Sequence, residues 1–230
     1  MPNILAFDTA TNACSAALWS AGGVIASRHE DMGRGHAERL MPMVGEVMAD
    51  VGMDSAALDL IAVTVGPGAF TGLRVGLAAA RGLALARNIP CFGATTTRTI
   101  QAALDCHDPA LVVLESKRAD FFLQVFAADG TALSDPAAVL PEGLAAFVET
   151  LGIGPGPITV AGDGAPRAAP YLTEAGWDIH DSAIRYPNAI DLAALAAATW
   201  KPGRDLPPPA PLYLRPPDAV VPLNGGRLRP

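Results

Sequence analysis

The sequence has few cysteines, few charged residues and no long apolar run. Cys14, Cys91 and Cys106 are widely separated and show no CxxC spacing, which excludes a disulfide framework and a cysteine metal site. The longest apolar stretch, 192–198, is far shorter than the roughly 20 residues that a membrane-spanning helix needs, and no charged segment precedes an apolar core at the N-terminus. We therefore expect reduced thiols in a cytoplasmic protein with no membrane association.

Positive charge is also scarce. Sixteen Lys and Arg residues stand against 23 Asp and Glu residues, giving a net charge of −7 and a pI of about 5.0, and the basic residues form no stripe. Because a nucleic-acid backbone requires a basic footprint, we expect no tight binding of RNA by this chain alone. Half of the 230 residues are hydrophobic, which is typical of a compact globular protein of one or two domains.

Strand, turn and helix patterns alternate through the first hundred residues. Three short apolar runs joined by tight turns predict an antiparallel meander, followed by an amphipathic helix containing Pro42, a buried strand, a glycine-rich turn, a helix with Thr71 as N-cap, and a short strand. These segments are 3–7, 13–19, 24–28, 36–51, 60–65, 66–70, 72–87 and 91–93. The order βββαβα is that of one half of the ASKHA (actin/hexokinase/Hsp70-like) fold.

The second half has the composition of a related α/β unit, without a clear sequence repeat. The expected strands and helices are 111–114, 121–127, 137–140, 142–151, 158–161 and 191–200. We place the boundary near 103–109, which predicts an N-terminal ASKHA-like domain with partner-binding helices (1–105), a C-terminal ASKHA-like domain (106–215) and an extended Pro-rich tail (216–230).

Asp8, Thr9 and Thr11 form the first candidate site, at the end of the first strand. Turn amides and hydroxyl groups can surround a phosphate while a carboxylate attracts a cation, so these residues are candidates for nucleotide binding. The alternative is that Asp, Thr and Asn here serve only the geometry of a hairpin turn.

Gly68 belongs to the second candidate, the Gly-rich segment 66–76. A glycine loop that opens a helix presents free amides and a positive dipole, a generic anion site. The segment is neither a Walker A loop nor GxGxxG. Tight packing of a strand against a helix would explain the glycines equally well.

No catalytic or metal site emerges from the remaining residues. His36 lacks a second histidine at position 40, so a capping or surface role is favoured over metal binding. Ser15, Ser116 and Ser182 lack a GxSxG setting, and Cys14 lies in an apolar strand. We predict no catalytic residues and no bound metal.

The two N-terminal helices carry more apolar residues than one face requires. Gly72, Gly76, Ala80 and Ala84 recur every four residues, and the first helix has methionines at 43 and 48. Small residues permit close helix approach, so these helices are candidates for a partner interface. Alternatively, each stripe faces its own sheet.

These motifs together resemble the TsaB (YeaZ) family, historically grouped with glycoprotease-like (M22) proteins. The matching segments are 4–11, 14–18, 36–42, 66–76, 82–84 and 213–215, of which GPGxFTGxRxG is the most specific. The sequence Glu115-Ser116-Lys117-Arg118 departs from the family's Asp-Ala-Arg string, and the second half resembles the family only weakly.

The resemblance implies a two-domain ASKHA fold and a non-catalytic subunit that supports the transferase TsaD in forming threonylcarbamoyladenosine at position 37 of tRNAs reading ANN codons. The His-x-x-x-His metal pair of TsaD is absent after Pro90. The family implies a heterodimer with TsaD, a homodimer in isolation, TsaE as a further partner, tRNA contact only through the complex, and no intrinsic cofactor beyond ATP or ADP at the partner junction. The predicted interface residues are His36, Leu40, Met43, Val44, Val47, Leu73, Gly76, Leu77 and Ala80.

Two other functions stay open on the sequence. One is a small-molecule kinase or ATPase of the same superfold, with Asp8 and Thr11 at the phosphates and 162–164 near the adenosine. The other is a metallopeptidase, which only the historical family label suggests.

Overall fold

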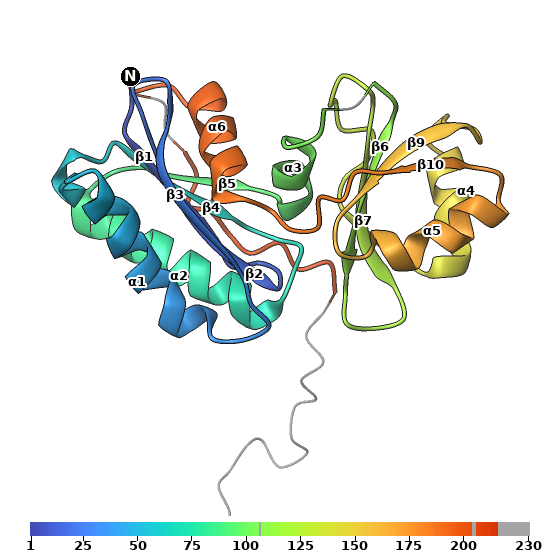
Figure 1. Cartoon of the computed structure of the whole chain (residues 1–230), viewed down its shortest axis with the longest axis horizontal. Coiled ribbons are helices and arrows are strands. Elements are labelled where there is room, and N and C mark those ends of the chain that lie inside the picture. The colour runs from blue at the N-terminus through green and yellow to red at the C-terminus, as the bar shows by residue number, and fades with distance from the viewer. Residues whose placement is uncertain (106, 204–205, 216–230) are drawn as a thin grey trace, which may run out of the picture.

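A computed structural model describes residues 1–105, 107–203 and 206–215. The predicted extended tail, 216–230, lies outside the described residues. The chain forms two lobes that lie side by side, each built on one five-stranded mixed sheet with helices on its faces (Figure 1).

The first sheet combines an antiparallel meander with two parallel strands. Its order is β3-β2-β1-β4-β5, in which β1 pairs antiparallel with β2 and parallel with β4. Its strands are β1 (Ile4–Asp8), β2 (Ala13–Ser20), β3 (Gly23–Asp31), β4 (Leu60–Thr64) and β5 (Cys91–Ala94). Both β1 and β4 are buried along their whole length, as their continuous apolar sequences predict.

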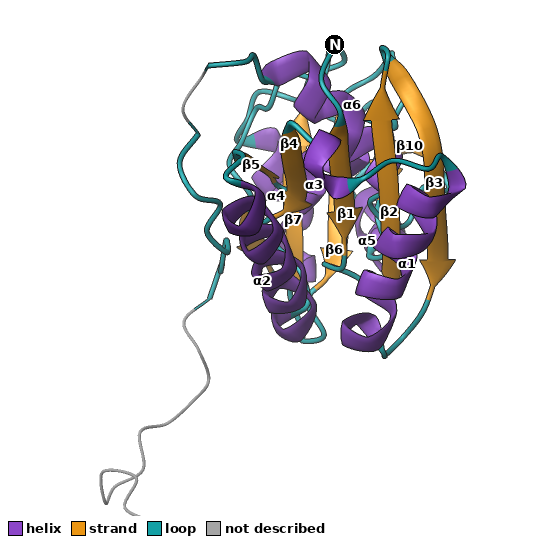
Figure 2. Cartoon of the chain, turned by 90° about the vertical axis from the view of Figure 1, so that its left-hand side faces the viewer, coloured by secondary structure: helices purple, strands orange, loops and turns teal. Residues whose placement is uncertain are grey.

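Helices cover both faces of this sheet. The helices α1 (His36–Asp50) and α2 (Phe70–Arg87) cross one face (Figure 2), and α6 (Ala189–Thr199) covers the other. The i, i+3, i+4 spacing of apolar residues puts Met43, Val47 and their neighbours against the sheet. The predicted helix at 36–51 is therefore confirmed, including Pro42 inside it.

The second sheet repeats the topology of the first. Its order, β10-β9-β6-β7-β8, is the same meander followed by two parallel strands. Its strands are β6 (Ala110–Glu115), β7 (Phe121–Phe126), β8 (Ala137–Val139), β9 (Pro157–Ala161) and β10 (Asp178–Asp181). The helices α4 (Leu144–Glu149) and α5 (Ala165–Glu174) pack together on one of its faces. The duplicated topology confirms the predicted two-domain ASKHA fold.

The two lobes do not correspond to a single division of the chain at residue 105, because α6 returns to the first lobe. Helix α6 follows the second sheet in sequence yet packs on β1 and β2 of the first lobe, where the Ala189 amide donates to Ser15 Oγ (2.9 Å). The buried alanines of α6 pack with Ala6, Ala17 and Ala62 of the first sheet in one apolar cluster. The first lobe therefore contains residues from both ends of the chain.

Several short elements also differ from the sequence expectations. Helix α2 begins at Phe70 with Ala69 as N-cap, so Thr71 is not the cap. The segment expected as one helix at 142–151 is a 3-10 turn (Pro141–Gly143) followed by α4. The sequence reading missed α3 (Thr96–Gln101), β10 and α5, which carries prolines at 166 and 170. A proline in the first helical turn removes no hydrogen bond, which accounts for Pro166.

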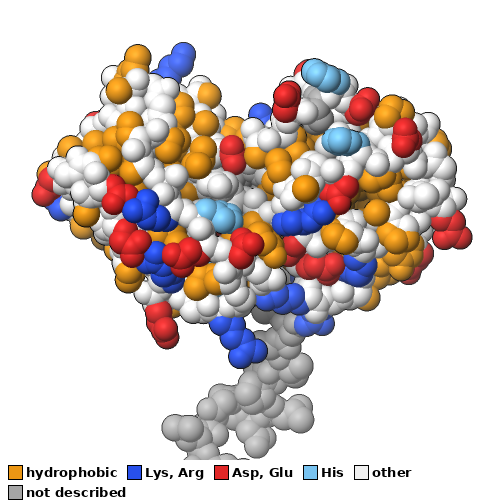
Figure 3. Space-filling view, viewed as in Figure 1, with side chains coloured by type: hydrophobic (Ala, Val, Ile, Leu, Met, Phe, Trp, Pro, Cys, Tyr) orange, Lys and Arg blue, Asp and Glu red, His pale blue; other side chains and the backbone are white. Residues whose placement is uncertain are grey.

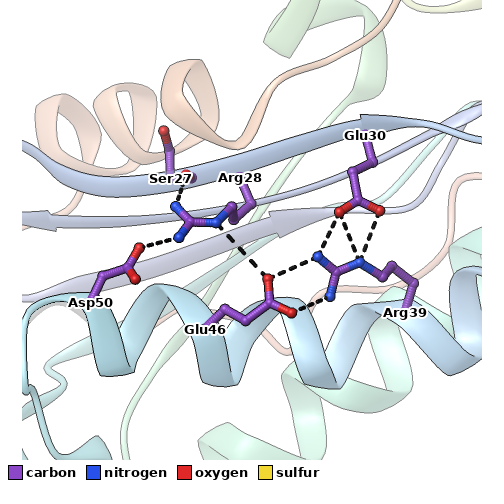
Figure 4. Close-up of polar contacts among 6 residues, drawn as sticks. All are labelled: Ser27, Arg28, Glu30, Arg39, Glu46 and Asp50. Atoms are coloured by element: carbon purple, nitrogen blue, oxygen red, sulfur yellow. Dashed lines mark hydrogen bonds and ion pairs between the residues drawn. The ribbon is translucent and has the colours of Figure 1, made fainter.

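An ionic network fastens α1 to the edge strand β3. The Arg39 guanidinium donates to both carboxylate oxygens of Glu30 and of Glu46, with donor–acceptor distances of 2.6 to 3.0 Å (Figure 4). Arg28 makes a second link, to Asp50. Hydrogen bonds from Arg39 lower the pKa of the Glu30 and Glu46 carboxyls. The network holds α1 in place on the sheet. The first turn of α1 lines a cavity between the lobes.

Candidate functional site

The β1–β2 hairpin, the first phosphate-binding candidate, faces the interior. Asp8 and Thr9 are 0% and 1% exposed, and Thr11 is 7% exposed. The Thr64 hydroxyl and the Ala10 amide both donate to Asp8 Oδ1, and Asp8 Oδ2 has no hydrogen-bond partner among the described residues. Burial raises the pKa of Asp8 to about 7, against the lowering effect of these hydrogen bonds.

The glycine loop packs directly onto this hairpin. The Ala69 amide donates to Ala10 O (2.7 Å), and the Thr9 hydroxyl donates to Gly72 O (2.7 Å). A Cβ atom at Gly68 would lie 2.3 Å from Ala10 O, and one at Gly72 would lie 2.0 Å from Thr9 O. The glycines at 68 and 72 thus pack against the hairpin backbone, and the hairpin that is a candidate for phosphate binding is in contact with α2.

A large cavity opens where the two lobes meet. Its volume is about 920 Å³. It is lined by the hairpin tip, the segments that begin α1 and α2, the β6–β7 turn and the C-terminal segment: 11–12, 33–38, 67–72, 74–75, 115–118, 122 and 212–215. Of the four predicted phosphate residues, Thr11 and Gly68 border this cavity, whereas Asp8 and Thr9 do not. Nucleotide binding by those four residues stays a prediction.

The C-terminal strap, residues 209–215, crosses both lobes. On the first lobe, the Leu212 amide donates to Val65 O (2.7 Å), and the ring of Tyr213 lies 5.3 Å from that of Phe70. On the second lobe, Arg215 pairs with Asp120 and lies over the Phe122 ring. The Tyr-Leu-Arg motif of the sequence is therefore the part of the strap that joins the lobes.

Replacing Arg215 by Gln should loosen the strap without unfolding the lobes. The change removes a partly buried ion pair and a cation–π contact, together worth roughly 1.4 kcal/mol, which corresponds to about tenfold faster exchange of the Leu212 amide. Hydrogen exchange followed by mass spectrometry or NMR measures this rate. Arg185→Gln is the control, because it breaks an ion pair with Asp181 in the second lobe that lies outside the strap. It should leave the exchange rate of the Leu212 amide unchanged. Equal protection of Leu212 in wild type and Arg215→Gln would contradict the joining role.

The structure corrects the positions predicted to touch a partner. All but one of them are buried in the core of their own lobe, beneath the helix surface: Leu40, Met43, Val44, Val47, Leu73, Gly76, Leu77 and Ala80. His36, at the first turn of α1, is half-buried and lines the cavity. The apolar stripes therefore face the sheet, which is the alternative that the spacing allowed. The exposed side of the same two helices is formed by other residues.

The sequence reading missed the basic residues around the cavity. Arg34, Arg74, Lys117 and Arg215 come from four separate segments of the chain, so no cluster is visible in the sequence. Figure 3 shows Lys and Arg side chains gathered where the lobes meet. The only signal was the sequence Glu115-Ser116-Lys117-Arg118, which departs from the family pattern.

The described residues contain neither a cluster of metal ligands nor a membrane-spanning helix. Over 1–105, 107–203 and 206–215, no three His, Cys, Asp or Glu side chains are grouped in a way that could hold a metal ion. Within the same ranges no helix is both long and apolar enough to cross a bilayer. The predicted absence of a metal stays a prediction.

Comparisons with known proteins agree with the geometry. Residues 15–163 match the family model of TsaD, tRNA N6-adenosine threonylcarbamoyltransferase. The tRNA threonylcarbamoyladenosine biosynthesis protein TsaB of Escherichia coli K12 is 30% identical over 221 residues, which are 92% of this chain and 94% of that protein. TsaB of Haemophilus influenzae is 39% identical over 111 residues, 48% of this chain and 47% of that protein.

A solved structure extends the likeness to the whole fold. YeaZ from Pseudomonas aeruginosa superposes with a TM-score of 0.78 at 27% identity, over 93% of this chain and 100% of that one. The E. coli relative and this structure both span nearly the full chain, including the second lobe that the sequence motifs covered weakly. The chain therefore belongs to the TsaB (YeaZ) family of tRNA threonylcarbamoyladenosine biosynthesis proteins.

Proposed function

We propose that the chain is a non-catalytic subunit that binds TsaD and supports synthesis of N6-threonylcarbamoyladenosine at position 37 of tRNAs that read ANN codons. The relatives named above are biosynthesis proteins of this modification, and a TsaD of Erythrobacter litoralis is 48% identical to this chain over 69 residues. Related chains are suited to pair through equivalent surfaces. The protein acts in the cytoplasm and contacts tRNA through the complex.

The observation that carries this proposal is the outer face of α1 and α2. We define the outer helix face by the exposed small or apolar residues that recur every three or four positions on the two helices: Met41, Gly45, Ala49, Ala78, Gly82 and Leu85. Met41 is 45% exposed and Leu85 is 84% exposed. An exposed apolar surface with small residues permits close approach of a second helix pair.

The proposal includes the other members of the complex. The outer helix face would hold TsaD, and in its absence a second copy of this chain. TsaE and ATP or ADP would bind at the junction with TsaD. The chain itself contributes no reacting group.

Met41→Asp and Leu85→Asp should each weaken the complex with TsaD. A carboxylate buried at an apolar helix contact raises the dissociation constant by about tenfold or more, roughly 1.4 kcal/mol. Ile190→Asp is the matched control, because Ile190 is 38% exposed on α6, on the opposite face of the sheet. Isothermal titration of purified TsaD into each variant measures the constants. Substitutions at Met43 or Gly76 would disturb the core and cannot test the interface.

If both aspartate variants bind TsaD like the wild type while Ile190→Asp weakens binding, the outer helix face is the wrong surface. Turnover of Mg-ATP by the isolated chain would instead favour the kinase or ATPase reading and overturn the non-catalytic role. Both assays use the folded full chain, whose circular dichroism spectrum and melting temperature are compared beforehand.

A further inference from the structure

The chain passes between the two lobes more than once. It runs from α3 into β6, returns from β10 into α6, and ends on the strap, which contacts both lobes. Helix α3 lies between the lobes (Figure 1), where it packs on β6 and β7 of the second sheet and on α6 of the first lobe. Lobes joined by such crossings are expected to move relative to one another unless a further contact holds them.

Two glycines leave room for the strap on the first lobe. A Cβ atom at Gly66 would lie 2.8 Å from Leu212 O, and one at Gly93 would lie 2.9 Å from Pro209 Cβ. Both distances are too short for a real Cβ atom. Pro209 is buried, and the Leu212 amide donates to Val65 O (2.7 Å), directly after β4. The strap is therefore a packed part of the first lobe.

Three side chains of α2 also contact the strap. Arg81 Nε donates to Pro209 O (3.0 Å), and Arg74 Nε donates to the Tyr213 hydroxyl (3.1 Å). The Phe70 ring lies 5.3 Å from the Tyr213 ring, and its centre lies 3.7 Å from Arg74 Cζ. Spacings of four and seven residues put these three side chains on one side of the helix. Helix α2 and the strap therefore form one unit.

Arg215 anchors the strap on the second lobe. Its guanidinium pairs with Asp120, donates to Ser116 Oγ (3.1 Å) and lies 5.2 Å from the centre of the Phe122 ring. The side chains of Asp120 and Arg215 are 15% and 26% exposed, so solvent screens this pair less than a surface pair. Ser116 Oγ itself donates to Asp120 Oδ1 (2.7 Å), which fixes the anchor within the β6–β7 turn. Three contacts thus converge on one arginine.

We infer that the strap is a clamp that holds the two lobes as one rigid body, and that Arg215 is the point at which the clamp releases. The first lobe holds the strap through backbone packing and α2, whereas the second lobe holds it through the Arg215 side chain. Loss of the Arg215 contacts therefore detaches the second lobe and leaves the strap on the first lobe.

The clamp also fixes the second lobe relative to the outer helix face. Arg81, which donates to the strap, lies three positions after Ala78 and four before Leu85 on α2. The strap therefore borders the outer helix face. The inference concerns the chain by itself and does not depend on the proposed function.

Residual dipolar couplings of backbone amides test the clamp in the isolated full chain, because they report the orientation of each lobe. Couplings from the two sheets of the wild type should fit a single alignment tensor, with the lobes placed as in the structure. Arg215→Ala should cause the loss of this common fit. Each lobe would then need its own tensor, and the couplings of the second lobe would shrink as that lobe averages over orientations. Within each lobe the couplings should still fit its own fold, which verifies that both lobes remain folded.

Three further variants separate the clamp from a general effect of charge. Arg215→Lys keeps an ion pair with Asp120 and should keep the common tensor. Arg185→Ala removes an ion pair with Asp181 within the second lobe and should also keep it. Asp120→Asn removes the charge on the second-lobe side of the anchor and should separate the tensors in the same direction as Arg215→Ala, so the test does not depend on one substitution.

Two results would overturn the inference. If the couplings of the wild type already need two tensors, the lobes move while the strap is in place. If Arg215→Ala and Asp120→Asn both retain the common tensor, the strap lies across the lobes without holding them, whether or not the Leu212 amide exchanges faster.

Discussion

Gly72→Ala should destabilise the protein by about 3 kcal/mol, whereas Gly82→Ala, ten residues further along α2, should stabilise it by about 0.5–1 kcal/mol. The Cβ atom of an alanine at 72 would lie 2.0 Å from Thr9 O, a backbone atom of the β1–β2 hairpin. Relief of that contact requires α2 to move away from the hairpin and breaks the hydrogen bond from the Thr9 hydroxyl to Gly72 O.

Gly82 is the matched control, because it lies in the same helix as Gly72 but does not contact the β1–β2 hairpin. Apart from its chain neighbours and the backbone of its own helix, no heavy atom lies within 4 Å of a Cβ built there, so alanine only restricts the unfolded chain and improves helix propensity. Urea unfolding followed by circular dichroism gives the free energy of unfolding for both variants. Equal stability of Gly72→Ala and wild type would show that the hairpin and the helix are not packed as described.

The glycines at 68 and 72 show how far the sequence alone could reach. Their spacing after a buried strand predicts a tight turn into a helix, which is correct. The sequence could not distinguish packing against a backbone from packing against a phosphate, because both need a residue without a side chain. Only the position of Thr9 O and Ala10 O shows the packing against a backbone, and these atoms lie in the β1–β2 turn, far from the glycines in sequence.

The helices α1 and α2 illustrate a second limit. Periodicity identified which residues share a face, and those residues are indeed buried together. Periodicity could not show how much of the apolar helix surface the sheet itself covers. The apolar residues of α1 and α2 that face the sheet were therefore predicted to contact a partner. The burial of these helix residues depends on β1, β2 and β4. The strands β1 and β2 precede both helices in sequence, and β4 lies between them.

Elements of the second lobe depended on long-range contacts that local patterns do not record. Helix α5 has two prolines and a short buried face formed by Ala165, Ala168 and Leu172, so its signal resembles that of a loop. Helix α6 was located correctly, yet nothing in its alanine-rich sequence indicates which sheet it covers. The cavity has the same origin, because residues 34, 74, 117 and 215 meet only after both lobes have formed.

The Asp8 carboxyl should make the protein less stable as the pH rises from 4 to 8. Its pKa is raised from 3.8 to about 7 in the folded state, chiefly because burial disfavours the charged form. The folded state therefore holds a proton that the unfolded state has released. The stabilisation is fully present below pH 3.8, is lost as the pH rises through 7, and amounts to roughly 4 kcal/mol in total.

Asp8→Asn should remove this part of the pH dependence, because an amide at position 8 has no proton to release in this range. The absolute stability of the variant is less informative than its slope, since the amide nitrogen would lie where Asp8 Oδ2 already lacks a partner. Urea unfolding at pH 4, 5, 6, 7 and 8 gives the slope for each protein.

Asp181→Asn is the matched control for that measurement. Hydrogen bonds from Arg185 lower the pKa of Asp181 to about 2, so its contribution is present above pH 3.8 and is lost as the pH falls toward 2. Removing it should alter the profile in acid and leave the slope between pH 5 and 8 intact. If Asp8→Asn retains the wild-type slope in that range, the carboxyl is ionised in the folded protein at pH 5. It would then have to be paired with a cation or water at the base of the hairpin.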